Sequence, residues 1–101
     1  MASHRIETYC RELQFPIGAL ILSKGIDRMV RSGRLDPLPY FRRHARGDWG
    51  EVTEEQWHAN GIALQSGAPL ESHYVVRPEL SIRIVTDAER RFTLIVLPSE
   101  V

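Results

Sequence analysis

Nine residues near the middle of the chain hold the side chains best suited to chemistry. Residues 42–50, RRHARGDWG, contain three arginines, a histidine, an aspartate and a tryptophan flanked by glycines. A histidine titrates near neutral pH, so His44 could act as a general acid or base. An arginine can bind a phosphate through two parallel hydrogen bonds. This stretch is therefore the first place to look for a functional site.

Metal-free cleavage of RNA would use such side chains together with a few hydrogen-bond donors. A base takes the proton of the 2′-hydroxyl, a cation stabilises the charge of the phosphorane, and donors hold its oxygens. Ser72 and Thr93 lie on predicted strands of one sheet and could donate. The candidate catalytic residues are His44, Arg43, Ser72 and Thr93. The alternative for His44 is structural, because the helix dipole favours a histidine near a helix C-terminus.

The sequence favours no metal, nucleotide or cysteine chemistry. The four histidines, His4, His44, His58 and His73, form no close pair, and there is no cysteine cluster, so neither a metal nor a cofactor is expected. No glycine-rich phosphate loop is present. The single cysteine, Cys10, has no nucleophile motif around it and is expected to be a small buried hydrophobic residue.

A formal net charge of zero hides an uneven distribution. Residues 24–46 hold seven basic and two acidic residues, whereas the rest of the chain holds six basic and eleven acidic ones. The basic region could bind phosphates or an acidic protein surface, or the two regions could simply pair with each other. The expected binding residues are Arg28, Arg31, Arg42, Arg43, Arg46, Asp48 and Trp49. The rival surface is the acidic helix start at Glu51, Glu54 and Glu55.

Length and composition indicate one small globular domain, residues 1–101. Hydrophobic residues make up 43% and charged residues 26% of the chain, which is ordinary for such a domain. No apolar run approaches the roughly 20 residues that span a bilayer, and the first residues lack the apolar core of a signal peptide. A lone cysteine forms no internal disulfide, which fits a reducing compartment. We therefore expect a cytoplasmic protein without membrane contact.

Hydrophobic periodicity predicts short helices in the first half of the chain. Residues 4–14 suit an amphipathic helix capped by Ser3, although a terminal strand is the alternative. Residues 17–22 are a short apolar run, typical of a strand buried on both faces or of the first turn of a buried helix. A helix should follow Ser23 and end at residues 32–33, and a second should follow the turn at residues 35–39.

The second half of the chain is expected to form one more helix and then a sheet. Residues 53–56, TEEQ, form a capping box in which Thr53 is the N-cap and Gln56 reaches back. This helix should run to about residue 65, with Trp57 and Leu64 on one face. Strands are predicted at residues 72–76, 80–86 and 92–97, antiparallel because their connections are short.

The fold class is therefore α+β, with short helices followed by a small antiparallel sheet. Trp49 lies between Gly47 and Gly50 beside the predicted helix ends. Glycines let the backbone approach another element closely. We expect the indole to be buried between the helices and the sheet.

Several segments together resemble a family of small uncharacterised proteins from plasmids, phages and other mobile elements. They are RRHARGDWGEV at residues 42–52, Asn60 followed by the helix end ALQSG, LESHY at residues 70–74, and IVTDAERRFTLIVLP at residues 84–98. The family shares a pattern like RH-x-x-GDWG, an alanine–leucine helix end, an S-x-Y strand and a closing T-x-LLP strand. The likeness extends over roughly residues 18–99.

This resemblance implies an accessory protein that binds and inhibits or modulates a host defence or nucleic-acid system, in the way that anti-CRISPR proteins do. The expected partner is a protein or ribonucleoprotein, and nucleic acid could bind at the basic region. The order of the elements also looks like the barnase–EndoU–colicin–RelE-like nucleases, so the alternative is a metal-independent ribonuclease. The chain departs from the family pattern at residues 69–71, PLE, and after Thr93, which favours binding over catalysis.

Overall fold

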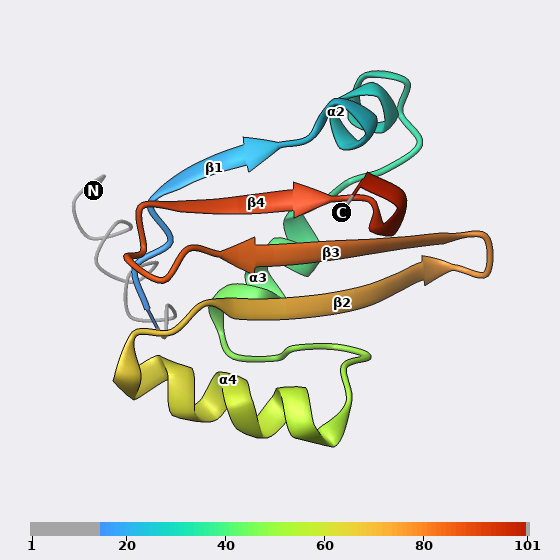
Figure 1. The fold of residues 1–101 in the computed structure, drawn as a ribbon. Helices are drawn as coiled ribbons and strands as arrows, with labels where there is room; N and C mark the ends of the chain where they lie inside the picture. The colour runs from blue at the N-terminus through green and yellow to red at the C-terminus, as the bar shows by residue number, and fades with distance from the viewer. Residues whose placement is uncertain (1–14, 101) are drawn as a thin grey trace, which may run out of the picture.

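The computed structural model describes residues 15–100, which form three helices and a four-stranded mixed sheet (Figure 1). Along the chain the elements are β1 (Ala19–Leu22), α2 (Lys24–Arg31), α3 (Leu38–Ala45), α4 (Glu54–Ser66), β2 (Leu70–Arg77), β3 (Leu80–Thr86), β4 (Phe92–Val96) and a 3-10 turn (Pro98–Glu100). The strand order is β1-β4-β3-β2. The predicted helix at residues 4–14 with its Ser3 cap, as well as His4 and Cys10, lie outside the described residues.

The α+β class is confirmed, with one addition to the predicted sheet. Strands β2, β3 and β4 are antiparallel as expected, but β1 joins the edge of the sheet parallel to β4. The prediction that residues 17–22 form a strand buried on both faces is wrong. Leu20 and Ile21 are 42% and 43% exposed, because β1 is the outermost strand.

Local capping explains where the helices begin. The Ser23 hydroxyl accepts from the backbone N–H of Ile26 at 3.2 Å and starts α2, and Thr53 accepts from Gln56 N–H at 3.1 Å and starts α4. The second half of the predicted capping box is wrong, because the Gln56 side chain donates to Asn60 Oδ1 instead.

One face of α4 also differs from the prediction. Asn60 and Ala63 are buried, whereas Trp57 is 45% exposed. The polar Asn60 takes an inward position because its side chain donates to the Glu71 carbonyl and accepts from the Glu71 N–H, which joins α4 to β2. A buried amide with these partners is satisfied, so it can replace an apolar residue on the packed face.

The core lies behind the sheet, where α3 crosses it (Figure 1). Inward residues of β3, Ile82 and Ile84, pack with Phe41 of α3 and Ile26 of α2. A second cluster lies toward α4 and includes Phe15, Trp49, Ala63 and Leu70. The predicted burial of Trp49 is confirmed, since it is 2% exposed.

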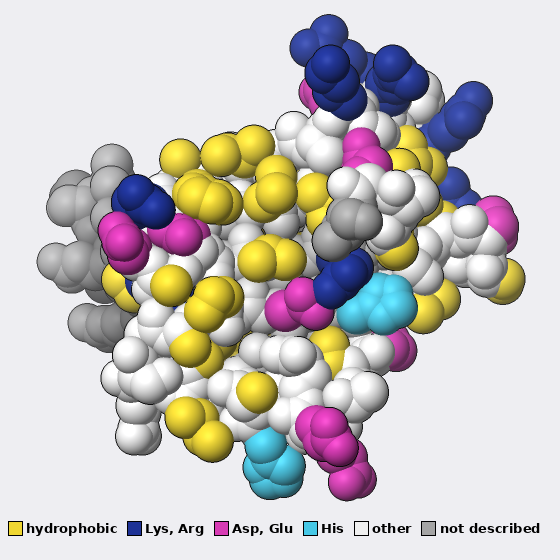
Figure 2. All heavy atoms as spheres, viewed as in Figure 1, with side chains coloured by type: hydrophobic (Ala, Val, Ile, Leu, Met, Phe, Trp, Pro, Cys, Tyr) yellow, Lys and Arg dark blue, Asp and Glu magenta, His cyan; other side chains and the backbone are white. Residues whose placement is uncertain are grey.

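No helix of residues 15–100 covers the opposite face of the sheet (Figure 1). The register places Ile21 beside Leu94 and Leu94 beside Val85, so an apolar stripe crosses three strands. Figure 2 shows hydrophobic side chains gathered over β1, β4 and β3 on this face. None of the helices within residues 15–100 is long and apolar enough to cross a membrane.

Candidate functional site

His44 lies in the last turn of α3 with its ring pressed against the sheet. The side chain is 0% exposed. Its Nδ1 is hydrogen-bonded to Ser72 Oγ on β2, and its Nε2 lies 2.8 Å from Thr86 Oγ1 on β3. Thr86 in turn contacts Thr93 Oγ1 on β4 at 2.8 Å. The fold therefore joins α3 and three strands through one buried chain of polar side chains.

Counting donors fixes the direction of this chain. Thr93 must give its single hydroxyl hydrogen to the Ile17 carbonyl, 2.8 Å away, because a carbonyl only accepts. Thr86 must then donate to Thr93, so it accepts from His44 Nε2–H. The remaining ring nitrogen, Nδ1, accepts from Ser72. The geometry is thus complete with a neutral imidazole that carries its proton on Nε2.

The surroundings of His44 favour this neutral form. Phe15 and Trp49 both meet the imidazole edge-on, with ring centroids 5.4 Å and 5.5 Å away. Burial, with a smaller contribution from the positive charge of Arg90, lowers the pKa of His44 to about 3. The expected stabilisation of a charged His44 by the helix dipole therefore does not apply, because the ring is uncharged at neutral pH.

The structure brings together part of the catalytic set expected from the sequence. His44 and Ser72 are in direct contact, and Thr93 is linked to them through Thr86. Sequence reasoning missed Thr86, although it alternates in phase with the apolar residues Leu80, Ile82 and Ile84 of its strand. Both nitrogens of the His44 ring are hydrogen-bonded and the ring is buried. In this conformation His44 is therefore a core residue that cannot reach a substrate as a base.

Arg43 points away from that cluster. Its Nε lies 2.8 Å from Asp48 Oδ2, and its guanidinium lies over the Tyr74 ring at 4.8 Å. The Asp48 hydrogen bond raises the pKa of Arg43, and the same bond lowers the pKa of Asp48. Asp48 also accepts from Gly50 N–H at 3.2 Å. These two residues, which the sequence predicts to bind a partner, also hold the turn after α3.

The chain after this turn pairs with the outer edge of β2. The Trp49 carbonyl accepts from His73 N–H at 3.1 Å, and Glu51 N–H donates to the His73 carbonyl at 2.6 Å. Gly50 sits between them at φ +72°, where an added Cβ would lie 2.2 Å from the His73 carbonyl oxygen. Trp49, expected among the contact residues, is the buried anchor of this segment.

The other predicted binding residues remain at the surface. Arg28, Arg31, Arg42 and Arg46 are exposed. Arg31 pairs with Asp27 at 2.9 Å, and Arg46 reaches only the Arg42 carbonyl at 3.4 Å. Figure 2 shows basic side chains gathered around α2, at the upper right of that view.

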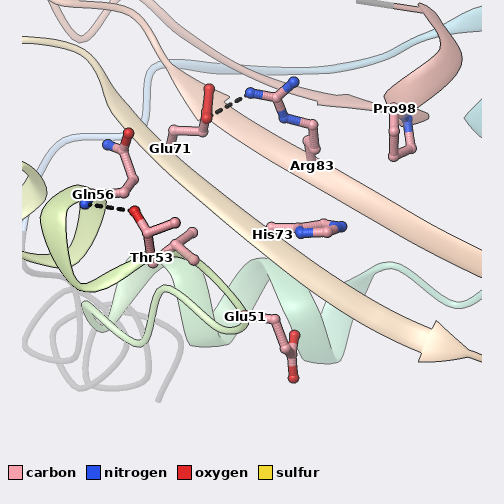
Figure 3. A pocket seen from close by; sticks show the side chains of 8 residues that line it. Glu51, Thr53, Gln56, Glu71, His73, Arg83 and Pro98 are labelled. Atoms are coloured by element: carbon pink, nitrogen blue, oxygen red, sulfur yellow. Dashed lines mark hydrogen bonds and ion pairs between the residues drawn. The ribbon is translucent and has the colours of Figure 1, made fainter.

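A hollow of about 350 Å³ lies where residues 51–53 pass β2, and sequence reasoning did not find it (Figure 3). Its residues include Glu51, Glu71, His73 and Arg83. Arg83 and Glu71 form an ion pair at 2.5 Å, so the guanidinium is already occupied. The strand alternation that turns these residues outward was the available signal. The two carboxylates, Glu51 and Glu71, outnumber the single guanidinium of Arg83, and this excess of negative charge disfavours a phosphate.

Comparison of the chain with models of known families, with curated proteins and with solved structures finds no match. The resemblance based on the GDWG motif therefore stays a prediction. In the described part of the chain, no group of three or more histidine, cysteine, aspartate and glutamate side chains is placed to hold a metal ion.

Proposed function

We propose that this chain is an accessory protein of a mobile element that acts in the host cytoplasm. It binds a host protein or ribonucleoprotein and inhibits or modulates a defence or nucleic-acid system, in the manner of an anti-CRISPR protein. One observation carries the choice of binding over catalysis. Four of the five arginines expected to contact a partner are exposed, whereas the histidine expected to catalyse is buried with both nitrogens bonded.

The exposed arginines are suited to a partner because their charge is not neutralised within the described chain. Within residues 15–100, Arg28, Arg42 and Arg46 take part in no ion pair with a carboxylate. An uncompensated charge speeds association with an oppositely charged surface. The charge favours an acidic protein surface or the phosphates of a ribonucleoprotein. The mobile-element setting and the inhibitory role rest on the resemblance of residues 42–52, 70–74 and 84–98.

The ribonuclease alternative receives less support from the same geometry. A general base must come within hydrogen-bond reach of the proton it removes. His44 would have to leave its contacts with Ser72 and Thr86 to do so. In the hollow beside β2, the guanidinium of Arg83 is paired with Glu71, so it does not meet a phosphate freely.

The test is protection of a mobile element inside a bacterial host. Strains that each carry one active defence system, CRISPR–Cas systems first, are transformed with a targeted plasmid while the protein is expressed. We expect the parent to raise transformation in at least one strain. The double variant Arg28→Glu with Arg31→Glu should lose about tenfold or more of that effect, because reversed charge opposes association.

A matched pair of substitutions controls for charge reversal itself. Glu54→Lys with Glu55→Lys reverses two exposed charges at the start of α4 and should leave protection unchanged. If the glutamate pair abolishes protection while the arginine pair does not, the acidic helix start is the interface. If no defence system responds to the parent, the proposed function is wrong.

A further inference from the structure

We propose that the partner is recognised by strand addition on β1. An extended segment of the partner, apolar with acidic residues at one end, pairs with the outer edge of β1 and lays its acidic end against α2. The existence of a partner rests on the function proposed above, whereas the mode of recognition rests on the geometry of β1 and α2.

The outer edge of β1 has backbone N–H groups that are bonded to no other segment of residues 15–100. Ala19 N–H donates to the Arg91 carbonyl and Ser23 N–H to the Ile95 carbonyl, both at 3.0 Å. Because N–H groups of alternate residues point to opposite sides of a strand, those of Leu20 and Leu22 point away from β4. Among residues 15–100, no segment pairs with this side of the strand.

Apart from its short length of four residues, this edge lacks, within residues 15–100, the devices that normally keep edge strands apart. Natural edges carry lysines, prolines or bulges, or are covered by another segment. The four residues of β1 are ALIL, and Leu20 and Ile21 expose apolar side chains on opposite faces of the sheet. An added strand would therefore gain backbone hydrogen bonds as well as apolar contacts on both faces.

The cationic helix at the end of β1 selects the partner's charge and orientation. Only Ser23 separates β1 from α2, where Lys24 and Arg28 are exposed and Arg28 forms no ion pair with a carboxylate of residues 15–100. Figure 2 shows the basic side chains beyond the apolar surface of β1, with acidic side chains among them. Glu100 is one carboxylate at this junction, where it accepts from the Ser23 hydroxyl and the Gly25 N–H. A second copy of β1 is a poorer occupant, because residues 16–25, PIGALILSKG, hold no acidic residue.

The probes are two fluorescent synthetic peptides of the same composition. One carries Val-Thr repeats followed by glutamates, and the other carries glutamates followed by the repeats. In a parallel addition the glutamates at the C-terminal end reach α2, and in an antiparallel addition those at the N-terminal end do. A third peptide with the same residues in scattered order is the control. Anisotropy titration should show that one ordered peptide binds about tenfold or more tighter than the scattered one.

The decisive variants are Leu20→Pro and Leu20→Ala. Proline removes the outward N–H while the inward bonds of Ala19 and Ser23 remain, and prolines are tolerated on edge strands in this orientation. We expect Leu20→Pro to weaken peptide binding about tenfold or more, whereas Leu20→Ala, which keeps the N–H, stays within about threefold. Hydrogen exchange in the parent gives a test without a variant: added peptide should slow exchange at the Leu20 and Leu22 amides.

Each contrary result is distinct. Strand addition is wrong if neither ordered peptide outbinds the scattered one, if Leu20→Pro binds like Leu20→Ala, or if exchange at Leu20 and Leu22 is unchanged by peptide. A parent dimer that Leu20→Pro converts to a monomer would assign the edge to a second copy and also overturn the proposal. Protection of plasmids by Leu20→Pro at the parent level would leave the proposed function standing without strand addition. Peptide binding at β1 without any protection of plasmids would support strand addition and contradict the proposed function.

Discussion

The two edge strands of the sheet differ in whether another segment pairs with their outer side. Along β2 the segment from Trp49 to Glu51 pairs with the outer edge, a glycine allows the close crossing, and the indole seals the core beneath. Along β1 no segment of residues 15–100 pairs with the outer edge, and its side chains are apolar. We call the edge along β2, where these specific side chains lie, the sealed edge. We call the edge along β1 the open edge, because its outward backbone groups meet no segment of residues 15–100.

This difference suggests where mutation should act. At the sealed edge, each residue meets several partners in a fixed geometry, so substitutions should lower the free energy of unfolding. At the open edge, substitutions should alter binding while the fold changes little. The tests below compare the two edges, beginning with the largest expected loss of stability.

Trp49→Ala should produce the largest loss. Removing a buried indole leaves a cavity among Phe15, Ala63 and Leu70 and should lower the free energy of unfolding by about 3–5 kcal/mol. Urea unfolding followed by circular dichroism measures this loss. Leu20→Ala at the open edge is the control and should cost much less, since Leu20 is 42% exposed. Equal losses in the two variants would contradict the difference between the edges.

Gly50→Ala should cause the second-largest loss in the free energy of unfolding. The positive φ of +72° alone costs an L-residue about 1–3 kcal/mol, and the new Cβ would also clash with the His73 carbonyl and the Tyr74 ring. Gly61→Ala is the matched control, because Gly61 lies inside α4 with nothing within 4 Å of an added Cβ. That change should stabilise the protein by about 0.5–1 kcal/mol. A Gly50→Ala protein as stable as the parent would show that the crossing tolerates a side chain.

Local signals in the sequence predicted much of this fold. Ser23 and Thr53 cap helices as their positions before apolar stripes indicate, and alternation located the three antiparallel strands. The parallel pairing of β1 with β4 joins segments more than seventy residues apart, and no local pattern carries that information. An all-apolar run of four residues is typical of a buried strand, so composition alone pointed to the wrong environment for Leu20 and Ile21.

In the candidate site, too, local sequence patterns predicted some features, and contacts between distant segments determined the others. The sequence predicted that His44, Ser72 and Thr93 belong together, and the strand register supplies the link through Thr86. The burial of these four side chains was harder to predict, because a histidine and three hydroxyl groups are polar. They can lie inside the core only because they form hydrogen bonds with one another. Arg43 was expected to serve a site, and no local pattern indicated that its long side chain turns back to Asp48.

The buried histidine makes the sealed edge sensitive to pH, which is the smallest of the expected effects. Burial lowers the pKa of His44 to about 3, from an ordinary value near 6.5 in the unfolded chain. Between these values the unfolded state binds more protons than the folded state. The free energy of unfolding is therefore fully retained above about pH 6.5 and falls as pH decreases through this window, with a slope that approaches about 1.4 kcal/mol per pH unit.

Urea unfolding between about pH 7 and about pH 5 isolates this contribution, since Asp48, whose pKa is lowered by its hydrogen bond from Arg43, matters only in stronger acid. His44→Gln removes the titrating group, so its stability should depend less on pH even if it is lower throughout. His58→Gln changes an exposed histidine and should keep the parent slope. Leu20→Pro should keep that slope as well, because β1 holds no titratable side chain. A parent whose stability is constant across this range, or a His44→Gln protein with the parent slope, would mean that His44 is not held neutral. The His44 imidazole could then accept a proton, and its burial would no longer argue against a role as a general base.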